Sequence, residues 1–142
     1  MNAVTKLIKL YRIPIVGKMS RRIVQLFGCE VPTSVIIGDN VVFVHNAVGT
    51  VIHENTEIKD NVKIYQNVTI GRGNIWEDAY SDFDGFLIEE GAVICAGAKI
   101  IGSHGKIIVG KNTVIGANAV LTKSTGDNEI WGGVPANMIR RK

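Results

Sequence analysis

An aliphatic or aromatic residue recurs at every sixth position along most of the 142-residue chain. The step is clearest between Ile52 and Ile70, where small or polar residues, many of them Asn or Asp, separate the isoleucines. A six-residue period matches neither the 3.6 residues per turn of a helix nor the simple alternation of a free strand. It is the period of a hexapeptide solenoid, in which short strands joined by tight turns form a parallel β-helix. Asn and Asp suit these turns because they tolerate left-handed backbone conformations. The positions of the repeat are Ile37, Phe43, Ile52, Ile58, Ile64, Ile70, Ile88, Ile94, Ile100, Val109, Ile115 and Leu121.

The repeat is interrupted at three places, where something other than packing sets the geometry. Phe43 and Ile52 are nine residues apart, and the segment between them carries His45. Residues 74–86 (NIWEDAYSDFDGF) are rich in carboxylates and aromatic rings, so we expect a loop that projects from one edge of the solenoid. This loop fits either a functional site or an acidic contact between copies. A shorter break at residues 103–106 carries His104.

The first 28 residues lie outside the repeat. Residues 3–12 and 18–27 each place apolar side chains on one helical face, with Ile23, Leu26 and Phe27 expected to face inward. Pro14 is expected to end or kink the first helix. The segment has six basic and no acidic residues, so we expect residues 1–28 to be a basic amphipathic helical cap. The cap either packs over the first coil or a neighbouring subunit, or rests on an anionic membrane surface. Residues 29–142 are expected to form the β-helix, with residues 124–142 as its C-terminal tail.

Composition agrees with a narrow all-β prism. Hydrophobic residues make up 46% of the chain but aromatic residues only 6%, which suits a core of Ile and Val. The open ends and flat sides of such a prism need covering, usually by a cyclic homo-oligomer. The net charge of +3 comes from the first 28 residues and is accompanied by no base-reading motif, which argues against nucleic-acid binding. No apolar run approaches the ~20 residues of a membrane span, no long apolar signal region is present, and the two cysteines have no CxxC spacing. These features favour a reduced, cytosolic protein.

Three histidines are candidates for chemistry. His45 leads because it lies at a register break beside a glycine-bearing turn. His53 follows Ile52 in a regular hexad and is expected to point outward at the surface. The function of His104 is open. The three do not converge easily on the tetrahedral site that zinc requires, so no metal is expected.

Four segments, in their order along the chain, resemble the hexapeptide-repeat acyltransferases. They are VHNAVGTVIHENTEIKDNVKIYQNVTIGRG, IEEGAVICAGAKIIG, VIGANAVLTKS and GGVPANMIRR. Within this family, residues 30–142 are most similar to the serine acetyltransferase branch and its short relatives in surface-polysaccharide pathways. The resemblance implies a left-handed parallel β-helix, an exception to the usual right-handed crossover. It also implies a homotrimer with active sites between subunits and acetyl-CoA as the donor.

The resemblance also assigns roles to individual residues. His45 matches the catalytic histidine, with one additional residue before Gly49, and would be the general base that takes the proton from the acceptor hydroxyl. Glu30 falls where serine acetyltransferases carry an aspartate that orients the base. Backbone N–H groups near Gly71 are candidates for stabilising the oxyanion. The residues expected at the acetyl-CoA site are Gly71, Ala96, Ala117, Thr122, Lys123 and Arg140.

Two departures from the family bear on the acceptor. This chain has Gly85-Phe86 where serine acetyltransferases carry a second histidine, and only about 28 residues precede the solenoid in place of a large helical domain. We therefore predict an O-acetyltransferase that acts on a sugar hydroxyl in surface-polysaccharide biosynthesis. Serine O-acetyltransferase of cysteine biosynthesis is the alternative, and a non-catalytic scaffold solenoid is the alternative of another class. The residues expected to bind the acceptor are Asn46, Trp76, Asp82 and Asp84.

Overall fold

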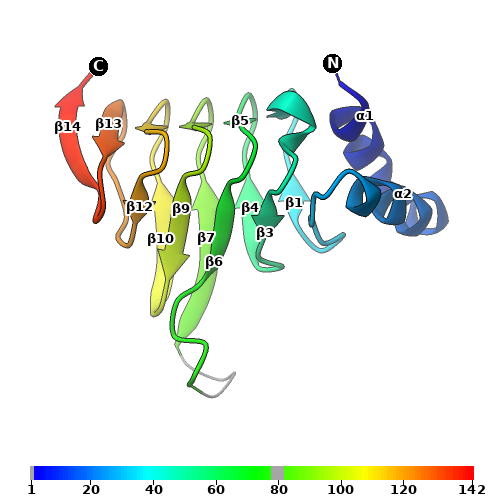
Figure 1. Cartoon of the computed structure of the whole chain (residues 1–142), viewed down its shortest axis with the longest axis horizontal. Helices are drawn as coiled ribbons and strands as arrows, with labels where there is room; N and C mark the ends of the chain where they lie inside the picture. Colours follow the sequence, from blue (N-terminus) through cyan, green and yellow to red (C-terminus); the bar gives the residue numbers. More distant parts are fainter. Residues whose placement is uncertain (1, 78–81) are drawn as a thin grey trace.

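The computed structural model describes residues 2–77 and 82–142. A three-sided solenoid carries two helices at its N-terminal end and a pair of strands at the other (Figure 1). Each of its four coils contributes one short strand to each side. The strands are β1 (Ile36–Ile37), β2 (Val42–Phe43), β3 (Val51–Ile52), β4 (Thr56–Ile58), β5 (Lys63–Ile64), β6 (Thr69–Arg72), β7 (Phe83–Ile88), β8 (Val93–Ile94), β9 (Lys99–Gly102), β10 (Gly105–Val109), β11 (Val114–Ile115) and β12 (Val120–Leu121).

The three sides are parallel sheets in the orders β1-β4-β7-β10, β2-β5-β8-β11 and β3-β6-β9-β12. Every strand pairs with the strand one coil further on, and the register places repeat positions directly opposite one another. Ile64, for example, pairs with Ile94, and Ile94 pairs with Ile115. The predicted parallel β-helix is therefore confirmed.

The residues of the six-residue repeat form the interior. One stacked column runs the length of the solenoid and consists of Phe43, Ile64, Ile94, Ile115 and Trp131, all of them buried. Asparagines occupy left-handed positions in the turns between strands, with φ between 54° and 61°. Their short polar side chains make this conformation accessible, which explains their regular spacing between the apolar positions. The turn asparagines are Asn40, Asn61, Asn67, Asn112, Asn118 and Asn128.

The N-terminal helices lie over the first coil. In α1 (Ala3–Lys9), the Thr5 hydroxyl accepts a hydrogen bond from the Phe43 backbone N–H at 3.0 Å. After the short helix η1 (Leu10–Arg12), α2 (Pro14–Leu26) begins earlier than expected, because proline is well suited to the first position of a helix. Only a narrow face of α2 packs inward. Ile23, Leu26 and Phe27, which we expected to face inward, are exposed. No helix in the two described stretches is long and apolar enough to cross a membrane.

The C-terminal tail is ordered. Strand β13 (Glu129–Gly132) extends the sheet of β11, and β14 (Asn137–Arg141) folds back against it in antiparallel orientation. The Trp131 indole N–H donates to the buried Glu129 carboxylate at 2.8 Å, and that carboxylate also accepts from the Gly126 backbone N–H at 2.8 Å. Trp131 thus closes the end of the interior column.

The expected loop at residues 74–86 is shorter than predicted. Its last four residues belong to β7, and Phe86 is buried in the core. The chain leaves the body of the solenoid after β6, as Figure 1 shows. Asp78 and Tyr80, which contributed to the prediction of a polar loop, lie outside the described residues.

Candidate active site

A strained turn presents His45 to solvent. The short helix η2 (Val44–Ala47) replaces the ordinary turn between β2 and β3. The three residues His45, Asn46 and Ala47 have φ of 53°, 56° and 45°, so three successive non-glycine residues are left-handed. Such conformations cost free energy and persist where surrounding contacts hold them, often at functional sites. Here Ala47 is buried and its carbonyl accepts from Thr50 N–H at 2.9 Å, while the Asn46 side chain accepts from Val4 N–H at 3.4 Å.

The His45 ring is exposed. It lies edge-on to Tyr65 with 6.1 Å between ring centroids. Within residues 2–77 and 82–142, no hydrogen bond or ion pair joins His45 to another side chain. Asn46, predicted to bind the acceptor, is adjacent but is occupied with α1.

Glu30 is not paired with His45 in a single chain. Its carboxylate accepts hydrogen bonds from Gln25 Nε2 at 2.6 Å and Arg21 Nη2 at 2.5 Å. These bonds hold the pKa of Glu30 below its usual value, so the carboxylate is ionised at neutral pH. The predicted orienting acid is therefore charged and held in place by α2.

Beyond Tyr65, small residues line the edge of the solenoid that begins at the His45 turn. On this edge Tyr65, Cys95 and Gly116 each come directly after a residue of the interior column in the sequence. Their backbone N–H groups donate to backbone carbonyls of the next coil at 2.8–3.0 Å. Ala96 is half-buried and Ala117 is exposed at the following positions, so the structure brings both onto the edge that carries His45. The thiol of Cys95 is free and half-buried, and burial raises its pKa. The edge offers a long surface with little side-chain bulk.

Two predicted donor-site cations lie at the C-terminal end of the solenoid. Lys123, which follows the exposed Thr122 after β12, places its ammonium 5.4 Å from the centre of the Trp131 ring. Arg140 is exposed on β14, where its backbone pairs with Ile130. Gly71 lies on β6, in the same sheet as β12 but two coils nearer the N-terminus.

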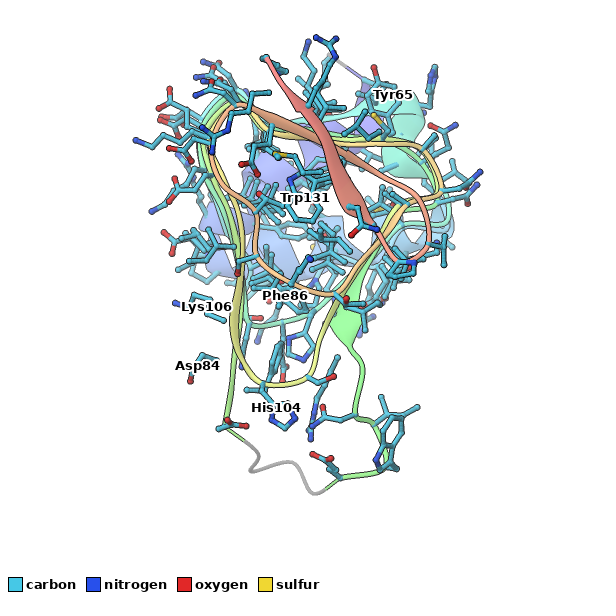
Figure 2. The ribbon with its side chains drawn as sticks, turned by 90° about the vertical axis from the view of Figure 1, so that its left-hand side faces the viewer. Tyr65, Asp84, Phe86, His104, Lys106 and Trp131 are labelled. Carbon is cyan, nitrogen blue, oxygen red and sulfur yellow. The ribbon has the colours of Figure 1, made fainter. Side chains whose placement is uncertain are left out.

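The remaining acceptor candidates gather at a different corner of the prism, between β6 and β7. Trp76 is 80% exposed, Asp84 is exposed on β7, and Asp82 bonds to His104. In the view along the solenoid axis, Tyr65 marks the corner of His45, whereas Asp84 and His104 lie at the far end of the triangle (Figure 2). One chain therefore does not bring these residues to His45.

His53 lies at this second corner, and the prediction that it points freely outward was wrong. Its ring packs edge-on against Phe83 and Phe86, with 5.4 Å and 5.9 Å between ring centroids. Its Nδ1 accepts from the Asn55 backbone N–H at 3.1 Å, and burial lowers its pKa, so the ring is neutral at pH 7. The two phenylalanines close together in the polar segment were the only signal in the sequence for this contact. In the described part of the chain, no group of His, Cys, Asp and Glu could hold a metal ion.

Comparison with known proteins adds to this geometry. No protein-family model matches the chain. It is 33% identical over 113 residues to a putative serine acetyltransferase of Schizosaccharomyces pombe, covering 80% of this chain and 39% of that protein. It is 34% identical over 114 residues to a serine acetyltransferase of Mycobacterium tuberculosis, covering 80% and 46%. The chain thus spans about half, or less, of the length of these relatives.

Solved structures agree with the sequence comparison. A serine acetyltransferase from Brucella abortus, solved in complex with coenzyme A, superposes with a TM-score of 0.76 and 28% identity, covering 98% of this chain and 54% of that one. A serine acetyltransferase from Vibrio cholerae gives a TM-score of 0.77 and 28% identity, covering 98% and 52%. These neighbours have a left-handed β-helix, which confirms the predicted fold class. The chain is thus similar to serine acetyltransferases in sequence over about 80% of its length and in fold over almost all of it.

Proposed function

We propose that this chain is an O-acetyltransferase that moves the acetyl group of acetyl-CoA to a hydroxyl group, with His45 as the general base. One observation carries the proposal: an exposed histidine, held by a strained turn, lies at one end of an edge lined by small residues. The similarity to serine acetyltransferases, one of them solved with coenzyme A, supports this reading.

The mechanism follows from the properties of imidazole. Neutral His45 takes the proton of the acceptor hydroxyl while the oxygen attacks the thioester carbonyl. As the carbon–sulfur bond breaks, the imidazolium returns that proton to the departing CoA thiolate. Histidine suits both steps because its ordinary pKa lies close to neutral pH, and general base catalysis of this kind contributes ~10²–10⁴-fold in rate. Glu30 would orient the imidazole through a carboxylate lone pair other than those that accept from Gln25 and Arg21.

The donor would lie along the edge of small residues. Ala96 and Ala117 leave room for the extended pantetheine arm beside the solenoid. Lys123 and Arg140, at the C-terminal end of the same molecule, would bind phosphate groups through charge-assisted hydrogen bonds. This arrangement places the thioester near His45 and the nucleotide near the C-terminus.

A homotrimer accounts for the separation of the two corners. Cyclic symmetry brings one corner of each copy against a different corner of the next copy. The β6–β7 corner of one chain, with Gly71, Trp76, Asp82 and Asp84, would then complete the site at His45 of its neighbour. A trimer would also cover flat sides that a single solenoid exposes.

L-Serine is the first candidate acceptor, which reverses the order expected from the sequence. The relatives and neighbours reported above are serine acetyltransferases, and none of them is a polysaccharide enzyme. A sugar hydroxyl is the second candidate, because this chain has Gly85-Phe86 in place of the second histidine expected of a serine enzyme.

Release of CoA from acetyl-CoA, followed with a thiol reagent, tests the proposal across L-serine and a panel of UDP- and dTDP-sugars. Turnover with L-serine supports a short cysteine-pathway enzyme, and turnover with one sugar alone supports polysaccharide modification. Calorimetric titration with CoA provides the second measurement. Absence of both turnover and CoA binding would leave the scaffold alternative and overturn the proposal.

A further inference from the structure

Two interruptions of the repeat meet at the second corner in a hydrogen-bonded pair. His104 Nδ1 lies 2.7 Å from Asp82 Oδ1, and the two side chains are 64% and 73% exposed. The backbones are joined as well, since Gly105 N–H donates to the Asp82 carbonyl at 2.8 Å. The ladder between β10 and β7 shifts register between Gly105 and Lys106, which is a β-bulge beside His104. Bulges of this kind redirect side chains and are frequent next to active sites.

The pair fixes which nitrogen of His104 faces outward. A carboxylate only accepts hydrogen bonds, so Nδ1–H donates to Asp82 and Nε2 is left for a ligand. The Asp82 hydrogen bond and charge raise the pKa of His104, so a larger fraction of the ring carries a proton on Nε2 at neutral pH. The ring can therefore donate to an oxygen of a ligand when charged and accept from a hydroxyl when neutral. His53 lies at the same corner. It has the opposite tautomer, and its ring packs against two phenylalanines.

The backbone excludes an imidazole at Gly85, the first of the two residues, Gly85-Phe86, that stand where serine acetyltransferases carry their second histidine. Gly85 has φ of 103°, and a Cβ at this position would lie 2.2 Å from the Asn55 carbonyl oxygen. A side chain there would require the neighbouring coil to move. The nearest exposed imidazole that the described chain offers at this corner is His104.

We propose that His104 is a positioning residue for the acceptor and that it serves the His45 site of a neighbouring copy of this chain. The inference rests on the proposed function. Its ligand is a small hydroxylated acceptor with a second oxygen group, which Nε2 of His104 binds while His45 of the other copy takes the reacting proton. Asp82 holds the ring, and the wall of His53, Phe83 and Phe86 limits where the acceptor can lie.

Steady-state kinetics of His104→Ala test this assignment. Acetyl-CoA is kept saturating, and the concentration of the acceptor is varied. The acceptor is the one that the wild-type chain uses, L-serine or a nucleotide sugar. The KM for the acceptor is expected to rise about tenfold, the effect of losing one hydrogen bond to a charged group, while the KM for acetyl-CoA stays unchanged. Asp82→Asn, which keeps the size of the side chain, should raise the acceptor KM by less. Lys106→Ala removes an exposed charge from the same interruption and should change neither constant. Because an exposed ion pair adds little stability, none of these variants should unfold the chain.

Mixed assemblies test the contribution from a second copy. His45→Asn chains and His104→Ala chains are dissociated together, reassembled and assayed at an acceptor concentration near the wild-type KM. In a cyclic assembly on the order of a quarter of the sites then combine an intact His45 with an intact His104, so activity should exceed that of the two separate variants. No gain on mixing would overturn the shared site. An unchanged acceptor KM in His104→Ala, with normal wild-type turnover, would overturn the inference and leave the proposed function intact. If the wild-type chain turns over no acceptor, the proposed function fails, and this inference fails with it.

Discussion

Replacement of His45 by asparagine separates the chemistry of the imidazole from the geometry of the turn that carries it. The left-handed conformation at His45, with φ of 53°, costs an ordinary residue such as alanine roughly 1–2 kcal/mol, whereas asparagine adopts it readily. The exposed ring makes no hydrogen bond in the described chain and touches Tyr65 only edge-on. His45→Asn should therefore change the free energy of unfolding by no more than about 0.5 kcal/mol, as at other surface positions. Loss of the general base should lower kcat by ~10²–10⁴-fold, which corresponds to ~3–5 kcal/mol in activation free energy.

The assay pairs CoA release at saturating substrates with thermal unfolding of the same preparation. His45→Ala should lose the same activity and, in addition, about 1 kcal/mol of stability from its strained backbone. Asn61→Ala is the matched control, since Asn61 is an exposed left-handed residue in a turn of another corner. It should lower stability by a similar amount and leave kcat unchanged. A folded His45→Asn variant with wild-type kcat would refute the assignment of the base.

Three further predictions concern the core, acid stability and the donor site. Ile94→Ala, in the middle of the buried column, should lower the free energy of unfolding by ~2–5 kcal/mol, measured by chemical denaturation, because the coils on both sides prevent collapse of the cavity; a loss below about 1 kcal/mol would contradict the tight stacking. The pKa of Glu30 is lower in the folded chain than in the unfolded one, so its contribution to stability is present above the unfolded pKa and is lost as pH falls through the folded pKa. Glu30→Gln should therefore unfold with a weaker dependence on pH between neutral and acid conditions, and an unchanged dependence would show that its bonds to α2 do not form. Arg140→Ala should raise the KM for acetyl-CoA about tenfold without changing the acceptor KM, the effect of one lost charge-assisted bond to phosphate; a change confined to the acceptor would place Arg140 elsewhere in the site.

The proposed site is divided between two corners of the prism, so its acceptor half depends on assembly of several copies. Measurements on a dissociated single chain would report binding of the donor along the edge of small residues but no productive acceptor site. Activity that rises with protein concentration and then levels off would be the corresponding signature of assembly. The same behaviour would be absent from a site contained within one chain.

The solenoid follows directly from the spacing of residues along the chain. The six-residue step of Ile58, Ile64 and Ile70 has one simple solution, in which each side chain stacks on its equivalent one coil away, and the asparagines between them supply the left-handed turns. The breaks in the step also made His45 a candidate site residue, because the six-residue register that packing would preserve is interrupted there. Both signals are local, since they depend on spacing along the chain and on the conformational preferences of single residues.

Which distant residues share a corner depends on how the coils fold against one another. Asp82 and His104 are 22 positions apart and meet only because two interruptions of adjacent coils dock on each other. The expected partner of His45, Glu30, is instead bound to Gln25 and Arg21 of α2, and His53 is covered by phenylalanines from a segment that looked too polar to enter the core. Contacts of this kind depend on how interruptions of different length fold over neighbouring coils, and the repeat carries no information about that geometry.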